Sequence, residues 1–157
     1  MRQPRGIVLV ALLLGMAFMG VLALLGADVW ATTLRHERET ELLFAGDQVR
    51  AAIRRYYYAT PAGQRRTLPP SLDELLEDHR FPTPVHHLRR LYPDPITGDA
   101  NWGLVLSGDR IAGVYSLSEA APLKQTGFAP AYAAFEGRGA YKEWAFTFIP
   151  PANNRRR

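Results

Sequence analysis

Cysteine is absent from this chain of 157 residues. The absence excludes a disulfide scaffold, a thiol nucleophile and a thiolate metal site, and it is compatible with any cellular compartment. The sequence also contains no internal repeat, no phosphate-binding loop and no serine-hydrolase motif. It therefore gives no motif for nucleotide binding or for nucleophilic catalysis by serine or cysteine.

The chain carries little excess charge beyond its first residues. Apart from Arg2 and Arg5, 17 of the 19 Lys and Arg residues remain, against 15 Asp and Glu residues. The only basic cluster lies at 155–157, and we interpret residues 151–157 as a solvated basic tail. This near balance predicts no nucleic-acid partner.

Charged residues are missing between Gly6 and Asp28, and the gap is filled by an apolar segment, residues 7–27. A bilayer core about 30 Å thick requires around 20 apolar residues in a helix. The segment therefore predicts a single-pass protein of a bacterial inner membrane. The basic residues of the leader, residues 1–6, predict a cytoplasmic N-terminus and a periplasmic C-terminal domain.

Proline is also missing between Arg5 and Thr60, and an amphipathic pattern follows the apolar segment. A single stripe at three- and four-residue spacing comprises Leu42, Ala45, Val49, Ala52, Ile53 and Tyr56. We predict one helix over about 7–59, with residues 7–27 as its transmembrane half and residues 28–59 as its amphipathic half. Its continuity disfavours the alternative, a cleaved secretory signal with its cleavage site at 29–31. Ala11 and Gly15, four residues apart, predict close packing between helices.

Residues 60–150 predict a periplasmic α+β domain. Ser71 and Glu74 fit a capping box for a short helix, and Thr83 fits the cap of a second short helix over 83–92. Alternating residues predict a hairpin of 102–106 and 111–115, a helical turn at 130–135 and a strand within 143–149. We expect an antiparallel sheet of three or four strands that packs on the stripe of the long helix. Tyr56 should lie in that core.

The order of these features resembles the type IV pilin and type II secretion pseudopilin family, in particular its major-pseudopilin-like branch. The resemblance is carried by Arg5-Gly6 before Ile7, by LPPSLDELLED at Leu68–Asp78, and by LYPDPITGDANWGLV at Leu91–Val105. It covers nearly the whole chain. It implies a structural subunit of a secretion or pilus-like assembly, which is not an enzyme and holds no cofactor.

The resemblance also implies how the N-terminus is processed. A prepilin peptidase would cut after Gly6, and Ile7 would become a methylated N-terminus. The long helices would pack side by side in a short filament, and the partners would be other pilin-like subunits and an inner-membrane assembly platform.

In one place the sequence departs from that family. The fifth residue after the cut is usually a glutamate that pairs with the amine of a neighbouring subunit, and here it is Ala11. A buried amine without a partner is costly, so the departure favours a minor or tip-like subunit, with an uncleaved relative as the alternative. The family's calcium site is not expected, because Glu119, Glu136 and Glu143 are well separated in the sequence.

Three histidines, His79, His86 and His87, lie near acidic residues in the sequence and are the candidates for a metal or acid-base site. They match no metal-ligand spacing, and on a helix His86 and His87 would point about 100° apart. A surface role beside Arg89 and Arg90 is therefore favoured. We predict no metal site and no catalytic residues.

A second candidate site comprises Asp94, Thr97 and Asp99, which could hold a cation or form a turn, and we favour the turn. The rival hypothesis is an uncleaved, membrane-anchored periplasmic enzyme or metal-binding module that uses His79, His86 and Asp94. A third hypothesis is an anchored accessory or ligand-binding module that never polymerises.

Overall fold

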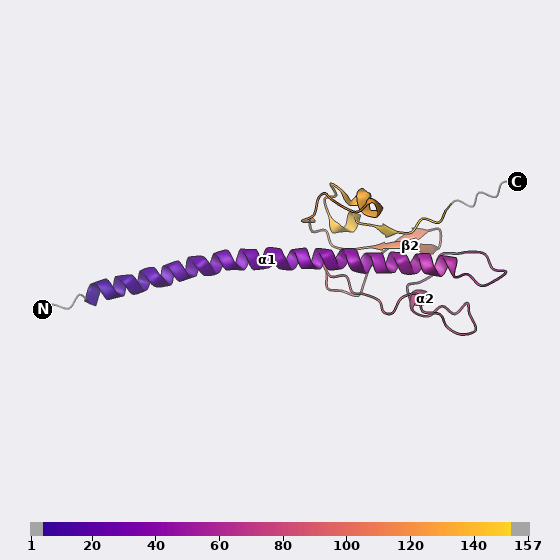
Figure 1. The fold of residues 1–157 in the computed structure, drawn as a ribbon, viewed down its shortest axis with the longest axis horizontal. Helices are drawn as coiled ribbons and strands as arrows, with labels where there is room; N and C mark the ends of the chain where they lie inside the picture. Colours follow the sequence, from indigo (N-terminus) through magenta and orange to yellow (C-terminus); the bar gives the residue numbers. More distant parts are fainter. Residues whose placement is uncertain (1–4, 152–157) are drawn as a thin grey trace. The chain divides into compact units, whose positions relative to one another are not determined.

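The computed structural model describes the backbone of residues 5–151 and the side chains of residues 6–22 and 30–151. Residues 1–4 of the predicted leader and residues 152–157 of the predicted tail lie outside the described residues. The chain divides into two compact units, Met1–Glu37 and Arg38–Arg157. Helix α1 (Arg5–Tyr58) belongs to both of them (Figure 1). The prediction of one uninterrupted helix in this region is confirmed.

The predicted membrane span is contradicted. In the part of the chain that the structure describes, no helix combines the length and the hydropathy needed to cross a bilayer. The assignment to the inner membrane, with a cytoplasmic N-terminus and a periplasmic domain, is therefore withdrawn.

In the second unit, α1 forms the spine of the core. Every residue of the predicted stripe is at most 2% exposed: Leu42, Ala45, Val49, Ala52, Ile53 and Tyr56. They pack with apolar side chains of the sheet and of the segments before and after it. The prediction from the 3.6-residue period is confirmed, including the inward position of Tyr56.

The segment after α1 contains one short helix, α2 (Asp73–Leu76). Its N-cap residue is Leu72 and no side chain caps it, so the predicted Ser71–Glu74 capping box is wrong. The second helix predicted over 83–92 is also wrong, because these residues are not helical. They form an irregular segment with bends instead. Val85 forms an isolated bridge with Asp78, and the N–H groups of His87 and Leu88 donate to the carbonyl of Leu75, at 2.9 and 2.8 Å.

The sheet has three antiparallel strands in the order β1 (Gly103–Ser107), β2 (Arg110–Tyr115) and β3 (Phe146–Thr147). The predicted hairpin is confirmed, with Gly108 at a φ of 66° in its turn and a register shift between Val105 and Leu106. The predicted strand within 143–149 is shorter in the structure than its alternation indicates. In Figure 1 the sheet and α2 lie on opposite sides of α1 in this unit.

Aromatic side chains connect the sheet to the helix. The 3₁₀ segments η1 (Pro130–Phe135) and η2 (Tyr141–Glu143) flank the cluster, and η1 confirms the predicted helical turn. The ring of Phe135 stacks on Trp144 with centroids 5.3 Å apart and meets Phe146 edge-on at 5.2 Å. Phe146 in turn packs directly against Gly46 of α1. The coarse prediction of a helix-plus-sheet α+β fold is therefore confirmed.

Candidate functional site

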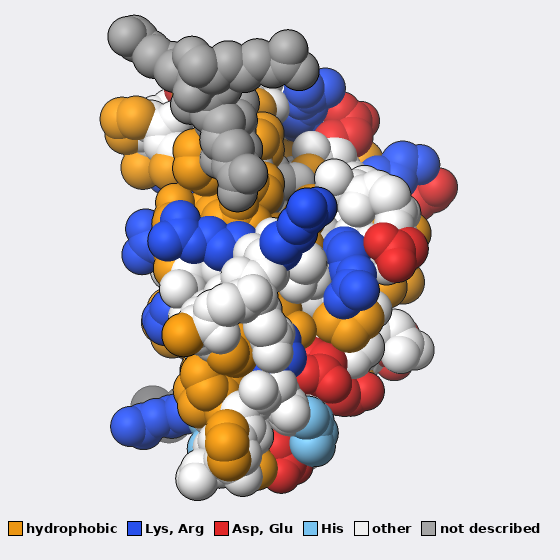
Figure 2. Space-filling model, turned by 90° about the vertical axis from the view of Figure 1, so that its right-hand side faces the viewer, with side chains coloured by type: hydrophobic (Ala, Val, Ile, Leu, Met, Phe, Trp, Pro, Cys, Tyr) orange, Lys and Arg blue, Asp and Glu red, His pale blue; other side chains and the backbone are white. Residues whose placement is uncertain are grey.

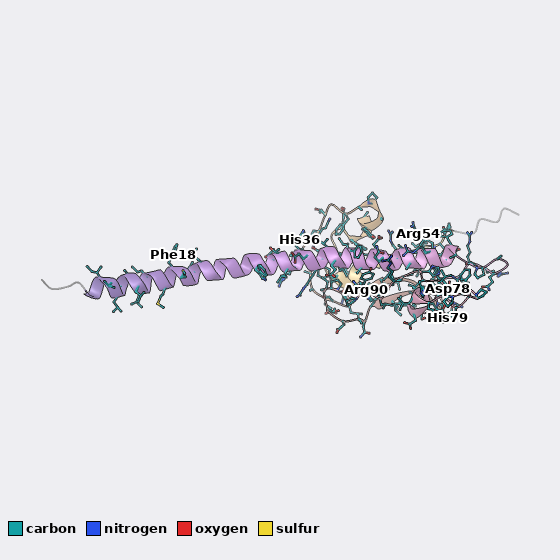
Figure 3. The ribbon with its side chains drawn as sticks, turned by 60° about the horizontal axis from the view of Figure 1, so that its bottom comes forward. Phe18, His36, Arg54, Asp78, His79 and Arg90 are labelled. Carbon is teal, nitrogen blue, oxygen red and sulfur yellow. The ribbon has the colours of Figure 1, made fainter. Side chains whose placement is uncertain are left out.

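The first unit presents an apolar helix surface. Every described side chain from residue 6 to residue 22 is exposed, including Ile7, Phe18 and Met19 at 66–72% (Figure 3). Apolar residues occupy all sides of this part of α1, whereas a surface helix of a globular protein is apolar on one stripe only. An apolar surface of this extent marks a contact region for another apolar partner.

One face of this helix carries a depression suited to a partner side chain. Gly6, Ile7, Val10, Ala11 and Leu14 line this depression, which is shallow and open. The spacing i, i+3, i+4, i+7 from Ile7 to Leu14 is that of the hole into which a neighbouring helix inserts a side chain. The small Ala11 leaves room in that hole, and a Cβ added at Gly15 would meet no atom within 4 Å. The predicted processing residues Gly6 and Ile7 both line this depression.

The second unit contains a buried charged cluster among the candidate residues for metal or acid-base chemistry. Asp78 is fully buried, and its carboxylate accepts hydrogen bonds from Arg80 Nη2 at 2.7 Å and from His87 Nε2 at 2.9 Å. The side chain of His87 is only 4% exposed, so the predicted surface role is wrong for this residue. The error follows from the predicted helix, because residues 83–92 are not helical, and here His86 is exposed whereas His87 is buried.

The pKa of Asp78 shows how tightly the cluster is coupled. Burial alone would raise this pKa, but the hydrogen bonds from Arg80 and His87 outweigh burial and lower it to about 2. Asp78 is therefore ionised at neutral pH, and His87 Nε2 carries the proton that it donates. The acceptor sites of the carboxylate are occupied by the protein itself, which leaves it poorly placed to take a proton from a substrate.

The same cluster holds the end of α1. Arg80 Nη2 donates to the carbonyl of Tyr56 at 2.8 Å, and its guanidinium lies 3.5 Å from the centroid of the Tyr56 ring. In the opposite direction, Arg55 donates to the carbonyl of His87 through Nη2 at 2.8 Å and Nε at 3.2 Å. The arrangement joins the last turns of α1 to the segment 78–88, which is a structural role.

The remaining predicted candidates do not form a shared site. His79 is exposed, with Nδ1 3.5 Å from a Glu74 carboxylate oxygen, and the exposed His86 contacts the carbonyl of Leu76. Asp94 is fully buried, where it accepts hydrogen bonds from Ser116 Oγ at 2.6 Å and from the N–H of Ile96 at 2.9 Å. Among the described residues, no three His, Asp or Glu side chains come together as metal ligands.

The favoured turn at Asp94, Thr97 and Asp99 is confirmed. The N–H of Asp94 donates to the carbonyl of Asp99 and the N–H of Gly98 donates to the carbonyl of Asp94, both at 2.8 Å. Gly98 adopts a φ of 80°, which a glycine accommodates without strain. The oxygens of Asp94 are thereby used in holding the turn and the residue after β2.

The charged cluster predicts a measurable acid sensitivity. The pKa of Asp78 is about 2 in the folded chain, below its ordinary value of 3.8, so its contribution is complete above pH 4 and is lost as pH falls through 2. We expect this one carboxylate to account for about 2 kcal/mol of the fall in unfolding free energy. Urea unfolding at several pH values, compared between the wild type and Asp78→Asn, measures it. Equal pH dependence in the two proteins would contradict the assignment.

Two buried or paired acids on α1 were missed by sequence reasoning. Glu39 is 2% exposed and accepts the N–H of Lys124 at 3.1 and 3.2 Å, which fixes a distant loop on the helix. Asp47 accepts hydrogen bonds from Arg50 and from the hydroxyl of Tyr132. A signal for Glu39 was present, since it lies three residues before Leu42 and hence on the apolar stripe. Asp47 gave no such signal, because its partner Tyr132 is distant in the sequence.

Comparison with known proteins gives no relative from which a function could be transferred. No family model matches the chain, and neither the curated proteins nor the solved structures contain a match.

Proposed function

We propose that this chain is a pseudopilin-like structural subunit of a type II secretion or type IV pilus-like assembly. In this proposal the apolar part of α1 packs against the corresponding helices of other pilin-like subunits, and a prepilin peptidase cuts after Gly6. The second unit is the body that such a helix would carry, with the amphipathic part of α1 as the spine of a small α+β fold.

The observation that carries the proposal is the apolar helix surface of residues 6–22. Its side chains are exposed on all sides. Contact between this apolar surface and water is unfavourable, so the surface is more stable when another apolar surface packs on it. The hole of Ile7, Val10, Ala11 and Leu14 gives that surface the shape that helix-against-helix packing needs. An enzyme would instead need an accessible group of reactive side chains, and the buried Asp78 and His87 do not offer one.

Ala11 bears on the position of the subunit in such an assembly. Its methyl group offers no carboxylate to the N-terminal amine of a neighbour, and a buried amine without a partner destabilises the contact. A subunit at the end of a filament avoids this cost. We therefore propose a minor or tip-like subunit instead of one repeated along the filament.

Cleavage by a prepilin peptidase is the direct test. Co-expression of the chain with such a peptidase is expected to remove residues 1–6, and Gly6→Val is expected to abolish the cut. Mass spectrometry of the N-terminus measures both. The substitution introduces no steric clash at its Cβ, because a Cβ at Gly6 meets no atom within 4 Å.

The matched control is Gly20→Val, which makes the same change on the same helix, where a Cβ also meets no atom within 4 Å. It should be cut like the wild type. An intact N-terminus in the wild type, or equal cutting of Gly6→Val, would refute the processed-subunit proposal.

A further inference from the structure

A groove on the second unit includes the paired Asp47 and Arg50 but lies apart from the Asp78 cluster. It is lined by Asp47, Arg50, Ala51 and Arg54 of α1 and by Phe148, which follows β3, and its volume is about 300 Å³. The four helix residues have the spacing i, i+3, i+4, i+7 and therefore share one face. Arg54 projects from this part of the helix (Figure 3). The volume is at the lower end of the range for small-ligand sites.

The charges in the groove do not cancel. Burial alone would raise the pKa of Asp47, but hydrogen bonds from Tyr132 and Arg50 and the charges of Arg50 and Arg54 lower it, so Asp47 is an anion. Arg50 neutralises it through two hydrogen bonds, from Nη2 at 2.7 Å and from Nε at 3.1 Å. Arg54 is exposed and donates no hydrogen bond to any described residue. The groove therefore keeps one guanidinium with its donors unused and one excess positive charge.

The wall opposite the helix is aromatic and fixed in place. The N–H of Phe148 donates to the carbonyl of Ala112 at 2.8 Å, and its ring packs against Tyr57 and Tyr58 with centroids 5.5 and 6.0 Å away. Phe148 remains only partly buried, and it lines the groove. Figure 2 views the right-hand side of Figure 1, and on that face basic side chains lie beside hydrophobic ones.

The geometry points to a binding site for a carboxylate carried on an aromatic group. The carboxylate pairs with the guanidinium of Arg54, and the aromatic group packs on Phe148 and on the methyl of Ala51. The source of this chemistry is a free aromatic acid or the C-terminal aromatic residue of a peptide. This inference does not depend on the proposed assembly role.

The local charge favours a carboxylate over a phosphate. One excess positive charge balances a monoanion, whereas a phosphate dianion would be repelled by the Asp47 carboxylate at the edge of the groove. The planar guanidinium of Arg54 also matches a carboxylate through two parallel hydrogen bonds. An aromatic carboxylate therefore fits all three features of the groove: the unused donors of Arg54, the single excess positive charge and the aromatic wall.

Titration of the full chain tests the site, with the apolar helix dispersed in a non-ionic detergent and the binding followed by NMR at low ionic strength. Phenylacetate is the probe for the free acid, and a tripeptide ending in phenylalanine with a free carboxylate is the probe for the peptide. We expect phenylacetate to bind about tenfold more tightly than acetate, and inorganic phosphate to bind no more tightly than acetate. The tighter of the two aromatic probes identifies the source.

Arg54→Gln is expected to weaken aromatic-carboxylate binding about tenfold, and Arg54→Lys, which keeps the charge but loses the paired donors, to weaken it less. The matched control is Arg38→Gln, an exposed position on the same helix outside the groove, which should bind like the wild type. If Arg54→Gln unfolds, Arg54→Lys decides the question. Absence of binding to the wild type, or equal loss in Arg38→Gln and Arg54→Gln, would overturn the proposal.

Discussion

Gly113→Ala is expected to lower the free energy of unfolding of the second unit by about 3 kcal/mol. A Cβ at Gly113 would lie 2.4 Å from the carbonyl oxygen of Phe146 and 2.7 Å from the Cα of Thr147. Both are backbone atoms of β3, the strand paired with β2 at this position, so the added methyl group can be accommodated only by moving the strands apart. Urea unfolding followed by fluorescence of the buried Trp102 and Trp144 measures the loss.

Gly46→Ala provides an informative contrast. Its Cβ would also lie 2.4 Å from Phe146, but the atoms it meets belong to the side-chain ring. In a Phe146→Ala background the ring is absent, so Gly46→Ala is expected to become neutral or favourable, because alanine is the better helix former. Gly113→Ala should remain costly there, since its clash is with backbone.

Gly139→Ala is the control for this series. Its Cβ would have the Glu143 carboxylate oxygen as its nearest neighbour at 3.7 Å, an ordinary contact, and its expected effect is below about 0.5 kcal/mol. A loss at Gly113 no larger than that at Gly139 would contradict the close approach of β2 and β3.

Asp78→Asn is the second substitution with a large expected effect, about 3 kcal/mol or more. The isosteric amide keeps one acceptor oxygen, but it places an NH₂ group against donors on Arg80 and His87. The guanidinium of Arg80 is 15% exposed and already has one buried nitrogen, Nη1, without a partner among the described residues, so it loses its counter-charge in a poorly hydrated position. Chemical unfolding of the full chain measures the effect.

Asp73→Asn is the matched control, because Asp73 is exposed in α2, only five residues earlier in the chain. We expect it to change stability by less than about 0.5 kcal/mol. Adding Arg80→Gln to Asp78→Asn should restore part of the loss, because the unpaired charge is then removed. A difference of less than about 1 kcal/mol between Asp78→Asn and Asp73→Asn would show that the cluster does not stabilise the fold.

The parts of the fold that were predicted correctly have a local period. The stripe from Leu42 to Tyr56 repeats every three or four residues, and the hairpin alternates around a turn that contains Gly108. These signals depend only on residues that are close in the sequence. They were sufficient to place the helix spine and the hairpin, and alternation in 143–149 also placed the third strand, although not its length.

The errors have a non-local cause. Residues 83–92 have a plausible cap and apolar spacing, but the carbonyl of Leu75 takes the N–H groups of His87 and Leu88, which a helix would have used internally. His87 was assigned to the surface because the sequence did not reveal its pairing with Asp78, nine residues earlier. The groove of Arg50, Arg54 and Phe148 was missed for the same reason, since its two walls are far apart in the chain.

The hydrogen bonds that fix loops on α1 also determine when the second unit can fold. Glu39 bonds to Lys124 and Asp47 to Tyr132, each across 85 residues of sequence, and Gly46 packs against Phe146, farther still along the chain. A contact between residues so far apart in the sequence forms only after a long loop has closed, and closing the loop costs conformational entropy. We therefore expect this unit to fold more slowly than a helical bundle of similar size. On the ribosome, the cover of the α1 stripe stays incomplete until the residues of β3 have been synthesised. A nascent chain stopped before Phe146 is therefore the species that depends most on a chaperone.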